Sequence, residues 1–364
     1  MVNRICLRIC LVLFMLFLIS YHTNGQQLIG YYAGNARQIP EYSIERLSEV
    51  IFSFCHLKGN RLTIGNRNDS STIRTLVSLK KRNSSLKIIL SLGGWGGCKT
   101  CSTVFSTEKG RTEFCQSVKE ALDYFQADGI DMDWEFPSLP AFPGHPYSME
   151  DKENLTNLIS QLRKTLGSKK QITLLCAGFS PYLEGSVSYT SLLPYVDRFD
   201  LMTYDLIGSH MHYSGHHSSL YSTTWQISSA DHAVRYLDSL GIPNQKIAIG
   251  VAYYARLYKL RNASDTGLNQ PADFQKFVPM KELRLNYSEQ EGYLSYWDAE
   301  AKAPYRYNAK TGLYLTYDDG RSVAEKAAYA SEKKLNGIFF WELRLDNPRN
   351  GLTDALLKQM YKTK

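Results

Sequence analysis

Short apolar runs alternate with longer amphipathic segments from residue 27 to the end of the chain. The runs have the length and the β-branched or aromatic content of strands, whereas the segments between them, such as 111–126 and 149–167, have apolar residues at helical spacing. Strands that are apolar on both faces and are joined by helices are typical of a parallel sheet. Eight such runs predict an α/β fold, a closed TIM (β/α)8 barrel. The predicted strands are residues 28–34, 50–57, 87–95, 129–136, 172–180, 198–205, 246–256 and 336–343.

The connection between the seventh and eighth runs differs from the others in length. It extends from Arg256 to Leu335, about 80 residues, which is too long for a bare loop. It contains short strand-like pieces of its own and ends in a helix-like segment, 322–334. We therefore expect a small α+β module, about residues 257–320, inserted between strands 7 and 8 of a catalytic barrel that occupies 26–364.

The N-terminal segment has a different pattern. Arg4 and Arg8 precede an apolar run, 9–19, after which the sequence turns polar. This layout is typical of a secretory signal peptide, and the run is shorter than the roughly 20 residues that a membrane-spanning helix needs. Residues 1–25 are therefore predicted to be a signal peptide. We expect a secreted protein, extracellular or periplasmic, without membrane attachment once this segment is removed.

Composition adds little to this picture, with 43% hydrophobic and 21% charged residues, as in an ordinary globular protein. The formal net charge of +7 falls to +5 when Arg4 and Arg8 are removed with the signal peptide. Basic residues are spread along the chain and form no stripe, which argues against nucleic-acid binding. We expect a monomer that needs no cofactor and no metal ion.

Five cysteines remain after residue 25, an odd number, so at least one thiol is unpaired unless two chains are linked. Cys98 and Cys101 could form a short-range disulfide, or one of them could pair with Cys115. A single CxxC without a second one or a close histidine pair argues against a zinc site. Cys55 and Cys176 lie in apolar runs and are predicted to be buried thiols.

The segment 128–137, DGIDMDWEFP, carries the most informative chemistry. Side chains alternate along a strand, so Asp131, Asp133 and Glu135 share one face and the apolar residues between them share the other. The apolar face is predicted to pack under the helices, which directs the acid row into the barrel. Three like charges in such a place are costly and rarely serve a structural role. Glu135 comes last, at the carboxyl mouth where such barrels keep their chemistry, and the neighbouring carboxylates should hold it protonated as a general acid.

This segment resembles the DxxDxDxE signature of glycoside hydrolase family 18, the chitinase family, with Asp128 at its first acidic position and the acid row at the other three. The resemblance extends over nearly the whole chain after residue 25, and the insertion is similar to the extra module of the deep-cleft subgroup. Two cysteines after Trp95 and an alanine at position 255, where the family often has glycine, depart from the family pattern. Four further segments resemble family motifs: SLGG (91–94), MTYD (202–205), YAR (254–256) and FFWEL (339–343).

The resemblance implies an endochitinase-like enzyme that hydrolyses β-1,4 linkages in chitin or chito-oligosaccharides with retention of configuration, the substrate's own N-acetyl carbonyl acting as nucleophile. Glu135 would protonate the glycosidic oxygen and later activate water. Asp133 would orient the acetamido group and stabilise the oxazolinium intermediate, while Asp131 would share a proton with Asp133. Tyr204 would hydrogen-bond the acetamido carbonyl.

Aromatic side chains near the strand ends are candidates for the substrate cleft, because sugar rings present flat apolar faces. Trp341 is the candidate for the floor of this cleft. Met202 and Asp205 would line the acetamido pocket, and Arg256 would bind substrate or brace the insertion. The remaining substrate-binding candidates are Tyr31, Phe54, Trp95 and Tyr254.

Two alternatives share the fold and much of the signature. A chitin-binding lectin on the same barrel usually lacks the last acid of the signature, which is present here as Glu135. An endo-β-N-acetylglucosaminidase acting on the core of N-linked glycans shares the signature but usually lacks the inserted module.

Overall fold

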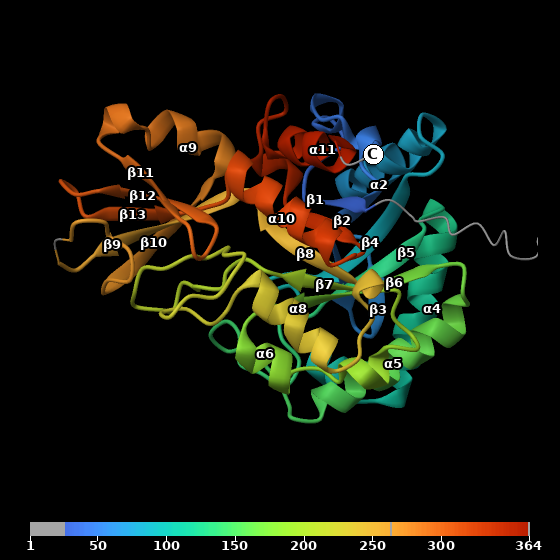
Figure 1. Cartoon of the computed structure of the whole chain (residues 1–364). Helices are drawn as coiled ribbons and strands as arrows, with labels where there is room; N and C mark the ends of the chain where they lie inside the picture. The colour runs from blue at the N-terminus through green and yellow to red at the C-terminus, as the bar shows by residue number, and fades with distance from the viewer. Residues whose placement is uncertain (1–25, 263, 363–364) are drawn as a thin grey trace, which may run out of the picture.

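The computed structural model describes residues 26–262 and 264–362 (Figure 1). The predicted signal peptide, 1–25, lies outside the described residues. Within the described part of the chain, no helix combines the length and the apolar character needed to cross a membrane.

Eight parallel strands form a closed barrel, which confirms the predicted fold class. Along the barrel the order is β1-β14-β8-β7-β6-β5-β4-β2, and β1 pairs with β2 to close it. A short strand, β3 (Arg61–Thr63), extends β2 as an antiparallel hairpin. The barrel strands are β1 (Gln27–Tyr32), β2 (Glu49–Lys58), β4 (Lys87–Gly93), β5 (Gly129–Asp133), β6 (Gln171–Ala177), β7 (Arg198–Met202), β8 (Ile247–Ala252) and β14 (Gly337–Trp341).

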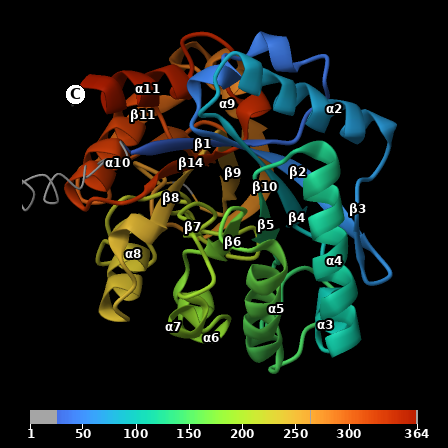
Figure 2. The ribbon, with the colours of Figure 1, turned by 90° about the vertical axis from the view of Figure 1, so that its right-hand side faces the viewer.

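Helices surround the barrel strands, with α2, α4, α5, α8 and α10 on its outside (Figure 2). Side chains cap several of their N-termini, such as Thr107 on α4 and Asp319 on α10. The helical spacing predicted for 111–126 is confirmed, because its apolar residues form the buried face of α4. The helices are α2 (Arg67–Ser78), α3 (Cys101–Phe105), α4 (Glu108–Phe125), α5 (Asp151–Leu166), α6 (Ser180–Gly185), α7 (Tyr189–Leu192), α8 (Ala230–Ser239), α9 (Met280–Asn286), α10 (Gly320–Glu332) and α11 (Leu352–Lys362).

A second, antiparallel sheet stands beside the barrel, with strand order β10-β9-β13-β12-β11 (Figure 1). The predicted seventh strand, 246–256, is divided between the two sheets, since β8 ends at Ala252 and β9 begins at Tyr254. Residues 254–256 therefore belong to the inserted sheet and not to the barrel. The strands of this sheet are β9 (Tyr254–Leu260), β10 (Ala272–Pro279), β11 (Leu294–Asp298), β12 (Ala303–Asn308) and β13 (Leu313–Thr316).

Six barrel strands, β1, β4, β5, β6, β7 and β14, end two or three residues earlier than their apolar runs suggest, and three of them precede predicted site residues. β4 ends at Gly93, β5 at Asp133 and β7 at Met202. The side chains predicted to carry chemistry at positions 95, 135, 204 and 205 therefore lie just past the strands, on the loops that form the carboxyl mouth of the barrel.

Candidate active site

Asp131 lies in the centre of the barrel and is fully buried. One of its carboxylate oxygens accepts hydrogen bonds from the hydroxyls of Tyr31, at 3.1 Å, and Ser91, at 2.7 Å. The other accepts from the hydroxyl of Thr173 at 2.7 Å. These donors come from β1, β4 and β6, so the prediction that the acid row points into the barrel is confirmed.

The apolar residues between the acids face the helices, as predicted. Ile130, Met132 and Trp134 are all buried. The Trp134 ring packs edge-on against Phe105 of α3, with 5.6 Å between ring centroids. Burial of this face against helices holds the acid row on the inside of the barrel.

Burial raises the pKa of both aspartates inside the barrel. The pKa of Asp131 rises to about 7, first through burial and then through the charge of Asp200, against the effect of its three hydroxyl donors. Burial and the charges of Glu135 and Asp131 raise the pKa of Asp133 well above its ordinary value. The Oδ1 atom of Asp133 is buried and has no hydrogen-bond partner among the described residues. Such an atom costs about 1–3 kcal/mol, so a partner that a ligand brings would be stabilising.

Glu135 is partly buried at the mouth, directly past the end of β5. Its pKa rises to about 8, first because of burial and then because of the negative charge of Asp205. The direction of this shift agrees with the sequence-based prediction. Glu135 and Asp133 also repel each other, as predicted, and Asp205 at the end of β7 adds a charge that the sequence did not indicate. A carboxyl group with this pKa is protonated near neutral pH and can act as a general acid.

Two glycines let the end of β4 approach β5 closely. Gly93 has a φ of +121°, and a Cβ atom there would lie 1.9 Å from the carbonyl oxygen of Asp133. The Gly94 N–H donates to that same oxygen at 3.0 Å, and the ring of Phe54 lies against the Gly94 Cα. The SLGG segment therefore supports the backbone of the acid row, because a side chain at Gly93 would displace it.

Tyr204 and Asp205 follow β7 and face the inserted sheet. Tyr204 is 6% exposed, and its ring packs edge-on against those of Tyr254 and Phe339. The Asp205 backbone is left-handed, with a φ of +56°, and its carboxylate accepts from Nε of Arg256. Burial alone would raise the pKa of Asp205, but the charge of Arg256 and a contact with His217 hold it well below its ordinary value. Asp205 is therefore a carboxylate near neutral pH.

The aromatic candidates are placed differently from one another. Phe54 and Trp341 stack with 5.4 Å between ring centroids and 21° between planes, whereas Trp95 stands at the mouth with 61% of its surface exposed. Tyr31 is fully buried and donates to Asp131, so in this structure its ring does not reach the cleft. Met202 and Tyr254 are almost completely buried beside Tyr204.

Arg256 joins the inserted sheet to the barrel. Its guanidinium lies over the ring of Phe274 on β10, 5.2 Å from the centroid, while it pairs with Asp205 at the end of β7. Of the two roles considered from the sequence, this geometry favours bracing.

Asp128 lies at the opposite end of β5 from Glu135. Its carboxylate accepts from Nζ of Lys80 at 2.6 Å and from the backbone N–H of Ile88 at 2.8 Å. The first acid of the signature thus joins the short 3-10 helix after α2 (Leu79–Lys81), β4 and β5 at the amino end of the barrel and is remote from the other three.

Several residues that complete the site were not identified from the sequence. Thr173 supports Asp131, and the fully buried His217 contacts Asp205. His145 lies next to the backbone that follows Glu135. Of these, only Thr173 carries a signal, as a polar residue in an otherwise apolar strand. In the described part of the chain, no group of three or more His, Cys, Asp or Glu side chains could hold a metal ion.

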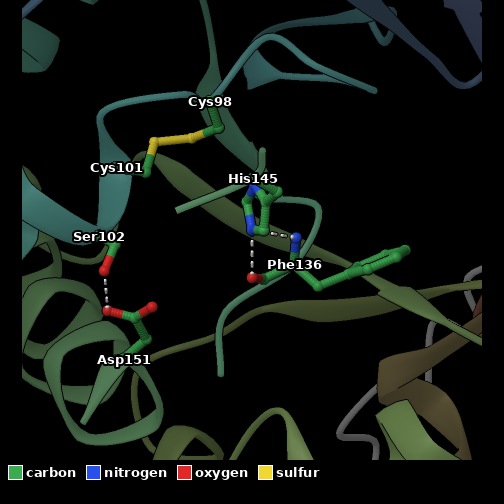
Figure 3. The surroundings of a disulfide bond; sticks show 6 residues. All are labelled: Cys98, Cys101, Ser102, Phe136, His145 and Asp151. Carbon is green, nitrogen blue, oxygen red and sulfur yellow. Dashed lines mark hydrogen bonds between the residues drawn. A yellow bond between two sulfur atoms is a disulfide. The ribbon is translucent and has the colours of Figure 1, made fainter. Parts of the chain in front are cut away.

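The loop beyond Trp95 is closed by a disulfide between Cys98 and Cys101 (Figure 3). The short-range alternative is therefore the one adopted, and Cys115 is a free, buried thiol. Cys55 and Cys176 are buried thiols as predicted, and burial raises the pKa of both.

Known proteins share both the sequence pattern and the fold. A model of the family described as glycosyl hydrolases family 18 matches residues 27–346. Chitinase A1 of Niallia circulans is 31% identical over 307 residues, which cover 76% of this chain and 43% of that relative, so this chain spans less than half its length. Chitotriosidase-1 of Mus musculus is 30% identical over 358 residues, which cover 91% of this chain and 73% of that relative.

A solved structure with this fold is a glycoside hydrolase family 18 N-acetylglucosaminidase from Paenibacillus barengoltzii. It superposes with a TM-score of 0.84 at 31% sequence identity, over 92% of this chain and 99% of the other.

Proposed function

The chain belongs to glycosyl hydrolase family 18, and from this premise we propose that it hydrolyses β-1,4 linkages between N-acetylglucosamine units of chitin or chito-oligosaccharides. The observation that carries the proposal is the buried Oδ1 atom of Asp133, the last residue of β5, which has no partner among the described residues and stands in the sequence between Asp131 and Glu135. An acetamido N–H is a donor that this oxygen could accept from.

In the proposed reaction, Glu135 protonates the glycosidic oxygen while the substrate's acetamido carbonyl attacks the anomeric carbon. Asp133, whose pKa is raised, shares its proton with Asp131, so that as a carboxylate it accepts from the acetamido N–H and stabilises the positive oxazolinium intermediate. Tyr204, whose almost completely buried ring lies against Gly250 of β8, donates from its hydroxyl to the acetamido carbonyl. Glu135, now a carboxylate, then activates the water that opens the oxazolinium ring, so configuration is retained.

The remaining predicted residues fall into two groups in this proposal. Trp341, Phe54 and Trp95 provide aromatic faces for sugar rings, with Met202, Tyr254 and Asp205 beside the acetamido pocket. Tyr31 supports Asp131 through its hydroxyl and does not contact sugar, and Arg256 holds the inserted sheet against Asp205.

We also propose that the protein is exported, since the pattern of residues 1–25 is that of a signal peptide and the Cys98–Cys101 disulfide suits an oxidising compartment.

Product analysis tests the proposed function directly. The purified protein is expected to release short N-acetylglucosamine oligomers from chitin and from a chito-oligosaccharide of defined length, with the β anomer formed first because the linkage is β and configuration is retained. Chromatography with anomer resolution measures both results. Binding without any product after long incubation would instead select a lectin, and cleavage of high-mannose glycoproteins but not of chitin would select an enzyme of the N-glycan core.

The pH dependence of kcat/KM tests the protonation state of Glu135. The acid must be protonated in the free enzyme, and its pKa of about 8 means that kcat/KM should fall by about tenfold per pH unit above pH 8. Because the charge of Asp205 is the second cause of this pKa, Asp205→Asn is expected to move the basic limb to lower pH. If kcat/KM instead began to fall near the ordinary glutamate pKa of about 4.3, the result would contradict the raised pKa of Glu135.

A further inference from the structure

A histidine outside the acid row lies directly behind Glu135. His145 is in the loop between β5 and α5, and among residues 141–150 it is the only buried one, with 7% of its surface exposed. Its imidazole Nε2 lies 3.2 Å from the backbone nitrogen of Phe136 and 2.9 Å from the carbonyl oxygen of the same residue (Figure 3). Phe136 is bonded directly to Glu135, so the imidazole contacts the backbone that carries the general acid.

This contact holds the backbone in either tautomer of the ring. An Nε2 atom without a proton accepts from the Phe136 N–H, and an Nε2 atom with a proton donates to the Phe136 carbonyl. One residue further along, the hydroxyl of Ser186 donates to the carbonyl of Pro137 at 2.6 Å. The chain that leaves Glu135 is therefore fixed at two successive residues.

The same ring also joins this backbone to the exposed aromatic at the mouth. The centroid of His145 lies 4.9 Å from that of Phe142, and Phe142 lies 5.9 Å from Trp95. Trp95 in turn packs edge-on against Phe136 at 6.1 Å. These four rings form one packed unit, so the imidazole has little freedom to leave the Phe136 backbone.

We propose that His145 is a positioning residue for Glu135, which acts by fixing the Phe136 backbone and thereby the distance between the carboxyl group and the glycosidic oxygen. This inference rests on the proposed function. A general acid must lie within about 2.6–3.2 Å of the atom that it protonates. A misplacement of about 1 Å can cost on the order of 10²-fold in rate.

The experiment compares two substrates that have the same N-acetylglucosamine glycone. One is a chito-oligosaccharide, whose sugar leaving group needs protonation, and the other is a dinitrophenyl glycoside, whose leaving group departs with little help. His145→Ala is expected to lower kcat/KM by about 10²-fold on the first and by less than about tenfold on the second. KM on the oligosaccharide should stay within about threefold, because the substrate contacts remain.

The ratio of the two kcat/KM values is independent of the fraction of folded protein, so partial unfolding cannot mimic the effect. His145→Gln, which retains one hydrogen bond to Phe136, is expected to lie between His145→Ala and the wild type in this ratio. His56→Ala, an exposed histidine on β2, is the matched control and should leave the ratio unchanged.

Two negative results are distinguishable. A wild-type protein that cleaves neither substrate would refute the proposed function together with this role. A wild-type protein that cleaves both, with an equal loss on both for His145→Ala, would overturn the positioning role and leave the proposed function intact.

Discussion

Glu135→Gln is expected to lower kcat on chito-oligosaccharides by at least about 10²-fold and up to about 10⁴-fold, because the amide cannot deliver a proton to the leaving oxygen. The replacement is nearly isosteric and removes the ionisable group whose pKa is raised to about 8. It also ends base assistance to water in the second step, so no later step restores turnover. Steady-state hydrolysis of an oligosaccharide of defined length measures the loss.

Binding separates loss of chemistry from loss of the site. The dissociation constant of the Glu135→Gln variant for the same oligosaccharide, measured by calorimetry, should stay within about threefold of the wild-type value, since the aromatic contacts are unchanged. Glu153→Gln makes the same substitution at an exposed position on α5 and should leave kcat unchanged. A Glu135→Gln variant that keeps more than a tenth of the wild-type kcat would show that another group is the acid.

The barrel could be predicted because its signal is spread over the whole chain. The barrel strands are buried on both faces over most of their length, so each one contains an apolar run, and the helices between them keep a separate period. The strand ends were predicted less well, because the apolar residues at the mouth continue beyond the last paired residue. Phe136 is buried against Phe179 and Tyr204 against Tyr254 and Phe339, although neither Phe136 nor Tyr204 is itself part of a barrel strand, and hydrophobicity does not distinguish such burial from that of a paired strand residue.

The acid row could be predicted because three carboxylates on one face of a strand are a local pattern. The contribution of Asp205 to the raised pKa of Glu135 could not, since Asp205 is 70 positions away from Glu135 along the chain and approaches it only through the fold. His145 was missed for another reason. Its partners are backbone atoms of Phe136, and because every residue has such backbone atoms, the sequence at position 136 does not indicate the contact.

Asp133→Asn is expected to lower kcat by about 10²-fold on chito-oligosaccharides, with a smaller change in KM. The carboxylate is proposed to accept from the acetamido N–H and to face the positive charge that develops on the oxazolinium ring. An amide can rotate to offer an oxygen to the acetamido group, but it is neutral and does not stabilise this charge. Because the charge develops only as the reaction proceeds, the loss should appear in kcat. Initial rates over a range of oligosaccharide concentrations separate the two parameters.

Asp128→Asn is the matched control for this prediction, since it makes the same substitution five residues earlier, at the other end of β5. Asp128 is held by Lys80 and by the Ile88 N–H at the amino end of the barrel, so its loss should affect stability, seen as a lower Tm, while kcat stays within about threefold. If Asp133→Asn and Asp128→Asn reduce kcat equally, the effect belongs to the strand and not to the charge at Asp133. If instead only Asp133→Asn lowers kcat, and both variants still bind the oligosaccharide, the Asp133 carboxylate acts on the reacting group. Comparing kcat of Asp133→Asn with kcat of Asp128→Asn therefore separates a loss of substrate assistance from a general effect on the barrel.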